Sequence, residues 1–310
     1  MMGKIKKKIL ITGIQGMLGQ DLSQVFDSDY EVYGIDINPD TDKPRVFLAD
    51  ITQRKDLEAL FLQIKPWMVI HGAAFTNVDL AESEQEQAKA VNVLGTENIA
   101  FLCQQYNAKL IFISTDYVFD GNKKTAYIET DKPYPLNYYG CSKLAAEQRV
   151  AACLTEYIIV RTSWLFGTKG KNFVKAIVNK ARADGDLKVV NDQIGSPTYT
   201  LSLAQALFWL TKSVFQSESE QSSYGIYHVS NSGQCSWFEF AQAILELTGI
   251  KAKLEPVDSD YIARAAKRPK FSVMDKSRFE KITGKKLCLW KQALEQYLSQ
   301  EKNQVVLPEE

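Results

Sequence analysis

Tyr139 and Lys143 have the residue types and the spacing that acid–base chemistry requires. In a helix, residues at i and i+4 lie on one face, so the phenol and the ammonium point to the same side. A tyrosine with an ordinary pKa near about 10 transfers protons poorly at neutral pH, and a nearby ammonium lowers that pKa because it favours phenolate. By itself the pair is also compatible with an ordinary surface helix, since this spacing is common.

Thr115 supplies a third reactive group. Ser114 and Thr115 end an apolar run of the kind found in buried strands. Open α/β sheets bind ligands at the carboxyl ends of their strands, and Tyr139 follows this strand in the chain. The sequence therefore predicts a proton-transfer site made of Thr115, Tyr139 and Lys143.

A glycine triplet predicts a second site, for a dinucleotide. Gly13, Gly16 and Gly19 lie directly between an apolar run and a helical pattern. Such glycines permit a tight turn, a close approach of backbone to a pyrophosphate, and packing of the helix on the strand, while the helix N-terminus attracts the phosphates. Asp36 follows Gly19 by 17 residues, where a carboxylate accepts hydrogen bonds from the ribose and repels a 2′-phosphate. NADH is therefore favoured over NADPH, although Lys43 and Arg45 follow closely.

A parallel sheet is needed to bring these residues together, and the pattern predicts one. Apolar runs predict strands at residues 9–12, 31–36, 45–48, 67–71, 109–114, 157–162 and 226–229. Helices are expected between them at residues 17–26, 55–64, 83–106, 142–153 and 201–215, and in a second lobe at residues 172–183, 237–247 and 290–298. The fold class is α/β, a Rossmann-type doubly wound parallel sheet with a smaller, discontinuous C-terminal α/β lobe.

The expected domain boundaries follow from this order of elements. Residues 1–166 and 197–231 form the dinucleotide-binding domain, and residues 167–196 and 232–300 form the substrate-binding lobe. The weakly patterned residues 301–310 are expected to fray.

Composition narrows the class of protein. The 310 residues carry 37 Lys and Arg against 37 Asp and Glu, and a neutral chain has no long-range attraction for nucleic acid. The five cysteines are widely spaced and form no Cys-x-x-Cys pair, which suggests reduced thiols. The first apolar run is too short for a signal peptide or a membrane span, so we expect a cytoplasmic protein acting on a small molecule.

Several longer motifs together resemble those of the extended short-chain dehydrogenase/reductases and, within them, of the dTDP-4-dehydrorhamnose reductases. The resemblance covers roughly residues 7 to 300 and is much more specific than any single motif. It rests on the glycine triplet and on residues 114–121, 135–143, 161–167, 191–198, 227–228, 236–240, 268–269 and 272.

The resemblance implies a reaction and a set of site residues. Hydride passes from reduced nicotinamide to C4 of a dTDP-linked 4-keto-6-deoxy hexulose, giving dTDP-L-rhamnose for surface polysaccharide. Tyr139 would protonate the C4 alkoxide, Lys143 would hold the cofactor ribose, and Thr115 would hydrogen-bond the carbonyl oxygen. The implied cofactor residues are Gly13, Gln15, Gly16, Met17, Leu18, Asp36, Asp50, Ile51, Ala73, Ala74, Thr76, Asn92, Tyr139 and Lys143. The implied substrate residues are Val78, Asp79, Thr115, Asp116, Tyr117, Tyr139, Trp164, which would pack against the sugar ring, Asn172 and Arg268.

Some of these assignments have a structural alternative. Asn92 lies in the middle of a predicted helix and could bond only to backbone, Asp79 could cap a helix, and Asp50 could cap the turn before Thr52. Neither His71 nor His228 has a second metal ligand nearby, and both are expected to be structural. Some relatives bind Mg²⁺ through glutamates at a dimer interface, one of them shortly after the Gly-Ser-Pro-Thr segment. Residues 199–203 contain no carboxylate here, so no Mg²⁺ requirement is expected.

Other functions remain open at this point. Epimerases and dehydratases of nucleotide sugars share the tyrosine and lysine, but dehydratases typically show an Asp-Glu pair where this chain has Asp116 and Tyr117. A reductase of a related 4-keto-6-deoxy nucleotide sugar would show the same motifs. So would a non-catalytic NAD(P)-binding regulatory subunit like that of methionine adenosyltransferase. The chain is expected to be a monomer or a homodimer.

Overall fold

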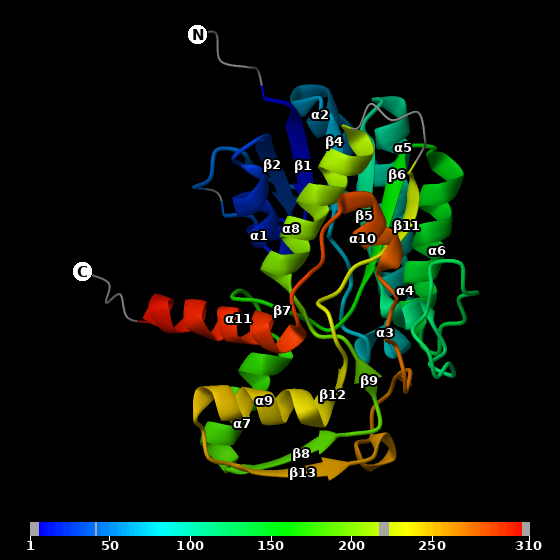
Figure 1. Cartoon of the computed structure of the whole chain (residues 1–310). Coiled ribbons are helices and arrows are strands. Elements are labelled where there is room, and N and C mark those ends of the chain that lie inside the picture. Colours follow the sequence, from blue (N-terminus) through cyan, green and yellow to red (C-terminus); the bar gives the residue numbers. More distant parts are fainter. Residues whose placement is uncertain (1–5, 41, 217–222, 306–310) are drawn as a thin grey trace.

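A parallel sheet of seven strands organises the described part of the chain, residues 6–40, 42–216 and 223–305 of a computed structural model (Figure 1). The strand order is β11-β6-β5-β4-β1-β2-β3, and every pairing is parallel. The strands are β1 (Lys8–Thr12), β2 (Glu31–Asp36), β3 (Val46–Leu48), β4 (Met68–His71), β5 (Lys109–Thr115), β6 (Tyr157–Thr162) and β11 (Gly225–His228). The predicted doubly wound α/β fold is confirmed.

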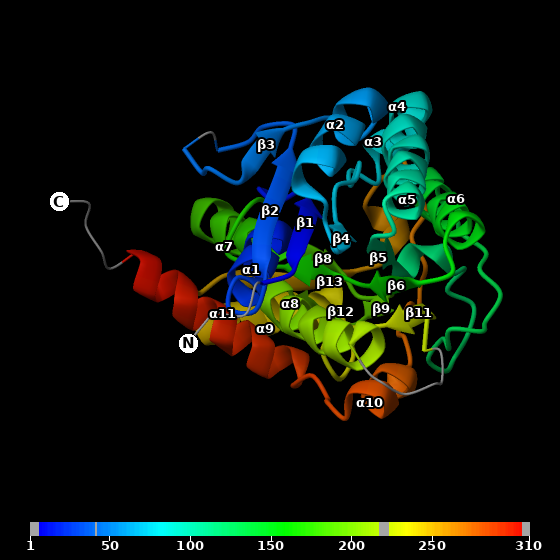
Figure 2. The same ribbon diagram turned by 90° about the horizontal axis from the view of Figure 1, so that it is seen from above.

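Helices cover both faces of this sheet (Figure 2). One face packs against α1 (Met17–Phe26), α8 (Thr200–Leu210) and α10 (Ser277–Thr283). The other face packs against α2 (Arg54–Ile64), α5 (Thr96–Gln105) and α6 (Tyr138–Cys153). Because the sheet is buried on both faces, its strands are continuous apolar runs, and the carboxyl ends of the strands are left to form a site.

The long helix predicted at residues 83–106 is broken into several pieces. They are α3 (Leu80–Ser83), α4 (Gln85–Lys89), the π-helical turn η1 (Ala90–Gly95) and α5. In the π turn, the buried amide of Asn92 bonds to the backbone of Phe75 rather than facing solvent. Helical periodicity alone cannot register such a local widening, which often marks a functional segment.

Two other helices have ends that differ from the prediction. Helix α6 begins at Tyr138, four residues before the predicted start, because the Asn137 side chain accepts a hydrogen bond from the Gly140 N–H and caps it. Helix α11 (Trp290–Val305) continues past the predicted end at residue 298. Residues 301–305 are therefore helical rather than frayed, and residues 306–310 lie outside the described part of the chain.

A second body of structure lies beyond the carboxyl ends of the strands (Figure 1). It contains α7 (Phe173–Asp184), α9 (Trp237–Thr248) and the parallel pair β8 (Asp186–Val190) and β13 (Lys253–Val257). Helix α11 packs against α9 in the same apolar core. Short two-strand pairings connect it to the main sheet: β7 (Leu165–Phe166) with β10 (Thr198–Tyr199), and β9 (Ile194–Gly195) with β12 (Cys235–Ser236). Across the described ranges, no helix is long and apolar enough to cross a membrane.

Candidate active site

The glycine turn between β1 and α1 has the geometry of an anion cradle. Gly13 has φ +71°, and a Cβ there would lie 2.9 Å from the backbone nitrogen of Ala73. A Cβ at Gly19 would lie 2.2 Å from the carbonyl oxygen of Gly13, so only glycine lets the helix approach the turn. The first turn of α1 has no side-chain cap and no acidic residue. Its free N–H groups and partial positive charge fit a pyrophosphate.

Asp36 ends β2 beside this turn. Its Oδ2 accepts a hydrogen bond from the Gln15 N–H at 3.0 Å, and its Oδ1 accepts one from the Asn38 N–H at 3.2 Å. Two backbone donors thus fix the carboxylate next to the glycine turn, as a ribose-binding acid requires. The residues Met17 and Leu18 open α1 at the same place.

Asp50 and Ile51 follow β3, and their visible roles are structural. The Asp50 Oδ1 accepts a hydrogen bond from the Thr52 N–H at 2.8 Å, which is the turn-capping alternative. The Ile51 side chain is buried beneath η1, where a Cβ at Gly95 would lie 2.7 Å from its Cδ1.

The loop after β4 contains Ala73, Ala74, Thr76, Val78 and Asp79, and two buried side chains hold its first half. The Ala73 N–H donates to Thr12 Oγ1 at 3.1 Å. The Asn92 Oδ1 accepts from the Phe75 N–H at 2.8 Å, and its Nδ2 donates to the Phe75 carbonyl at 3.1 Å and to Ser142 Oγ at 2.9 Å. Asn92 therefore joins this loop to helix α6, and its amide acts here as a structural link.

Thr115, Tyr139 and Lys143 meet at the carboxyl end of β5. Thr115 is the last residue of β5, and Tyr139 and Lys143 lie in the first two turns of α6. The Thr115 hydroxyl donates to Asp116 Oδ1 at 3.1 Å and accepts from the Tyr117 N–H at 3.2 Å. It lies near enough to the Tyr139 phenol to act on its pKa. The Lys143 Nζ lies 4.1 Å from the centroid of the Phe112 ring, and no hydrogen bond joins it to a residue of the described ranges. A buried ammonium without a hydrogen-bond acceptor fits a site that receives an oxygen-rich ligand.

The predicted lowering of the Tyr139 pKa by Lys143 is wrong for this structure. Burial and the neighbouring Asp116 carboxylate raise the pKa of Tyr139 to about 12, against the opposing hydrogen bond from Thr115. Lys143 itself is affected: burial lowers its pKa to about 7, while the Glu147 carboxylate acts to raise it. Burial also raises the pKa of Asp116 to about 7. Burial is the largest cause of the pKa shift in all three groups.

Asp79 and Arg268 form an ion pair between the loop after β4 and the C-terminal segment. The Arg268 Nη1 donates to Asp79 Oδ1 at 2.9 Å and its Nη2 donates to Asp79 Oδ2 at 2.6 Å. The Asp79 Oδ1 also accepts from the Ala266 N–H at 3.1 Å. These contacts lower the pKa of Asp79, chiefly through the hydrogen bond from Arg268. Asp79 is thus more than a helix cap: it connects the loop after β4 to the C-terminal segment.

A cavity of about 230 Å³ lies next to this ion pair. Three aromatic residues, Tyr117, Phe173 and Trp237, line it, and so do three cations. The cations are Lys188, Arg264 and Arg268. Aromatic rings beside guanidinium groups suit a base and a diphosphate. Tyr117 and Arg268 were predicted from the sequence as substrate residues. Arg264, four residues before Arg268 in a loop with further cations, was not predicted, and Trp237 was noted only as part of a motif.

Two predicted substrate residues are engaged elsewhere in this structure. Trp164, with φ +48°, stacks on Trp237 with ring centroids 3.5 Å apart and an angle of 6° between the planes. The Asn172 Nδ2 donates to the Gly167 carbonyl at 2.7 Å, and its Oδ1 accepts from the Lys175 N–H at 3.1 Å. Asn172 therefore caps α7, and its amide is occupied by the backbone.

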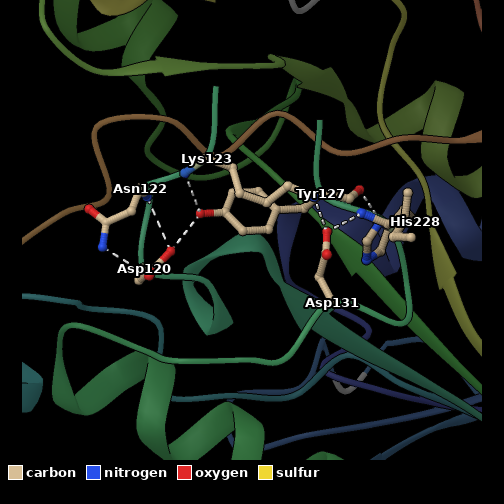
Figure 3. Close-up of polar contacts among 7 residues, drawn as sticks. Asp120, Asn122, Lys123, Tyr127, Asp131 and His228 are labelled. Carbon is tan, nitrogen blue, oxygen red and sulfur yellow. Dashed lines mark hydrogen bonds and ion pairs between the residues drawn. The ribbon is translucent and has the colours of Figure 1, made fainter. Parts of the chain in front are cut away.

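Both histidines are buried, one at the end of β4 and the other at the end of β11. The His71 ring nitrogens contact Thr12 Oγ1 at 2.6 Å and Thr96 Oγ1 at 3.0 Å. The His228 Nδ1 lies 3.1 Å from the carbonyl of Tyr127, whose hydroxyl donates to Asp120 Oδ1 (Figure 3). Burial lowers the pKa of each histidine to about 3, so both are neutral at physiological pH. Within the described ranges, no group of three or more His, Cys, Asp and Glu side chains could hold a metal ion.

Comparisons of this chain with known proteins agree on one family. Residues 7–303 match the family described as the RmlD substrate binding domain. The chain is 36% identical over 294 residues to the spore coat polysaccharide biosynthesis protein SpsK of Bacillus subtilis (strain 168), covering 94% of this chain and 97% of the relative. It is 36% identical over 296 residues to the dTDP-4-dehydrorhamnose reductase of Aggregatibacter actinomycetemcomitans, covering 93% and 97%.

A solved structure has the same fold over nearly the whole chain. It is the crystal structure of dTDP-4-dehydrorhamnose reductase from Bacillus anthracis in complex with NADP. The TM-score is 0.87 at 38% sequence identity, and the alignment covers 96% of this chain and 100% of that one.

Proposed function

This chain belongs to the RmlD substrate binding domain family, and on that premise we propose that it reduces dTDP-4-dehydro-β-L-rhamnose to dTDP-L-rhamnose with a reduced nicotinamide cofactor. The observation that carries the proposal is the group formed by Thr115, Tyr139 and Lys143 at the carboxyl edge of the sheet that also carries the glycine turn. Reduction of a ketone needs a hydride donor, a proton donor and a partner for the developing oxyanion, and these three residues meet the last two needs.

Tyr139 is the proton donor in this proposal. Its pKa of about 12 keeps the phenol protonated at neutral pH, as the reductive direction requires. Thr115 lies beside the same phenol, and its hydroxyl would turn from Asp116 Oδ1 to donate to the substrate oxygen. The proton leaves the Tyr139 hydroxyl and ends on the C4 oxygen of the product.

The cofactor is held by groups that the structure leaves available. The bound nicotinamide supplies the hydride. The N–H groups at the start of α1 receive its pyrophosphate, Asp36 receives a ribose, and Lys143 donates to the other ribose. An oxygen ligand near Lys143 gives this ammonium the acceptor it lacks among the described residues, and so favours its charged form.

We propose that the enzyme prefers NADH to NADPH. The Asp36 carboxylate, fixed by the Gln15 N–H, would repel a 2′-phosphate. The relative from Bacillus anthracis was crystallised with NADP, so a comparison of both cofactors is needed. Mg²⁺ is not required in this proposal, because Tyr139 and Thr115 already meet the proton and oxyanion needs of the reaction.

We place the nucleoside diphosphate of the substrate in the cavity that Arg264 and Arg268 line. Arg264 offers a guanidinium group for bidentate binding of a phosphate, and Arg268 adds positive charge while it stays paired with Asp79. Tyr117, Phe173 and Trp237 offer rings for the base. All of the lining residues except Tyr117 belong to residues 167–196 and 232–300, which supports assigning the substrate lobe to those segments.

The test is a spectrophotometric assay at 340 nm with the dTDP-4-keto sugar, NADH or NADPH, with and without EDTA. We expect oxidation of the cofactor and formation of dTDP-L-rhamnose. In Tyr139→Phe, kcat should fall by at least about 100-fold while the Kd for NADH, measured by fluorescence, stays within about twofold. Binding of NADH without turnover by the wild-type protein would contradict the proposal and favour a regulatory subunit. Normal turnover in Tyr139→Phe would contradict the mechanism.

A further inference from the structure

A buried ion pair, Glu147 with Arg161, lies directly behind the catalytic residues. The two side chains are 4% and 2% exposed. The Arg161 Nε donates to Glu147 Oε1 at 2.9 Å, and its Nη2 donates to Oε2 at 2.6 Å. The Ser114 hydroxyl donates to the same Oε1 at 2.6 Å. The Glu147 carboxylate therefore accepts two charge-assisted hydrogen bonds from Arg161 and one hydrogen bond from the neutral Ser114 hydroxyl.

This ion pair connects the elements that carry the catalytic groups. Glu147 lies four residues after Lys143 on α6, so both side chains lie on one face of the helix. Ser114 directly precedes Thr115 on β5, and Arg161 is its register partner on β6. Arg161 also lies over the Phe119 ring, 5.1 Å from its centroid. A buried ion pair is seldom the most stabilising choice for a core, because desolvation offsets its attraction. Its position here suggests a role in the site.

We propose that Glu147, held by Arg161 and Ser114, is a positioning residue that keeps Lys143 protonated and directed at the cofactor. This inference deepens the proposed reduction and depends on it. A fixed negative charge one helical turn from the ammonium favours the charged form and draws it toward that side of the helix. Arg161 holds the carboxylate in place through two hydrogen bonds.

The other charged groups around Lys143 cannot replace Glu147 in this role. His71, from β4, is neutral because its pKa is lowered to about 3. From β5 the ammonium meets the Phe112 ring, which carries no net charge. Asp116 of the 3₁₀ turn η2 (Asp116–Val118) acts on Tyr139 rather than on Lys143, and Tyr139 is a neutral phenol.

Two carboxylates on helices that pack against α6 are engaged elsewhere. Glu82 of α3 accepts a hydrogen bond from the Tyr138 N–H. Glu97 of α5 pairs with Arg149 at 3.4 Å in an exposed position. Glu147, by contrast, acts on Lys143 directly, and its carboxylate raises the pKa of the ammonium.

The test compares the pH dependence of kcat/KM for the keto sugar, at saturating NADH, in wild type, Glu147→Gln and Glu147→Asp. In Glu147→Gln the loss of activity at high pH should move to lower pH by about one unit or more, because the ammonium loses its negative neighbour. At a pH within this declining part of the profile, its alkaline limb, activity should fall about tenfold. Glu147→Asp keeps the charge and should retain a wild-type limb, even if kcat is lower.

Two further variants distinguish the proposed positioning role of Glu147 from a purely structural role. Glu147→Gln combined with Arg161→Met removes both charges and leaves no unpaired ion in the core, so it should fold even if Glu147→Gln does not. The limb should still be displaced to lower pH in this double variant. Glu97→Gln, which breaks the exposed pair between α5 and α6, is the matched control and should leave the profile unchanged.

The outcomes are distinct. A pH profile in Glu147→Gln and in the double variant that superimposes on wild type, with only thermal stability reduced, would overturn the proposal. A displaced limb in Glu97→Gln would overturn it as well, since loss of any carboxylate near α6 would then suffice. Failure of the proposed function itself would be seen separately, as absence of turnover in the wild-type protein.

Discussion

The buried amide of Asn92 offers the sharpest test of how this site is assembled. The family resemblance suggests that Asn92 binds the cofactor, whereas its contacts indicate a link between the loop after β4 and helix α6. Asn92→Ala removes the three hydrogen bonds to the Phe75 N–H, the Phe75 carbonyl and Ser142 Oγ. The residue is 1% exposed, so solvent does not reach these groups directly.

The expected loss follows from the groups left without a partner. Each buried polar group that loses its partner costs about 1–3 kcal/mol, and a water molecule entering the space recovers part of that cost. Three groups are affected, but Ser142 still donates to the Tyr139 carbonyl at 2.7 Å. We therefore expect the free energy of unfolding to fall by about 3 kcal/mol.

Urea denaturation measures this loss, and fluorescence titration with NADH measures the cofactor affinity of the same protein. If Asn92 is a structural link, stability falls by about 3 kcal/mol and the Kd for NADH rises by less than about tenfold, because the bound cofactor orders the loop again. The matched control is Asn98→Ala on the following helix. Its Nδ2 donates to the carbonyls of Ile51 and Thr52 at a half-exposed position, so we expect less than about 1 kcal/mol. A loss of stability under about 0.5 kcal/mol in Asn92→Ala, with a large loss of NADH affinity, would refute this reasoning.

Three further predictions follow from other parts of the structure. Asp36→Ala should lower the ratio of kcat/KM for NADH to that for NADPH by about tenfold, and an unchanged ratio would remove Asp36 from cofactor selection. Gly19→Ala places a Cβ 2.2 Å from the Gly13 carbonyl oxygen. This change should cost about 1–3 kcal/mol of stability and weaken NADH binding. Gly284→Ala, whose Cβ meets open space, should keep wild-type NADH affinity in the same titration. The His71 pKa of about 3 lies below its ordinary value of about 6.5, so the unfolded state binds more protons and stability is lost as pH falls from about 6.5 toward about 3. His71→Gln should reduce the slope of stability against pH by up to about 1.4 kcal/mol per pH unit, and an unchanged slope would contradict the pKa of His71.

The order of elements could be read from the chain because it depends on local patterns. All seven predicted strands, including the short one at residues 226–229, belong to the observed sheet. Apolar runs ended by Gly13 and Gly72, and helical patterns such as that of α1, are set by residues close together in the chain. The break at η1 was not predicted, since its π turn accompanies contacts of Asn92 with Phe75 and Ser142, which are far away in sequence.

The candidate site likewise has features that could be predicted from the sequence and features that could not. Residue types and spacing were sufficient to name Thr115, Tyr139, Lys143 and the glycine turn, because i, i+4 pairs and strand-to-helix turns are local features. The charge state of these groups was not predictable: burial in the tertiary structure raises the Tyr139 pKa and lowers that of Lys143, whereas spacing alone suggested the reverse for Tyr139.

Contacts between distant segments were decided only by folding. The pairing of Asp79 with Arg268 joins residues 189 positions apart, and the Glu147 carboxylate meets Ser114 and Arg161 from neighbouring strands. The rings of Trp164 and Trp237 stack although 73 residues separate them. Periodicity and motifs determine which elements form and which reactive groups this chain carries. Which side chains are desolvated, paired or left available depends on three-dimensional packing, because dielectric surroundings and hydrogen-bond partners come from the whole fold.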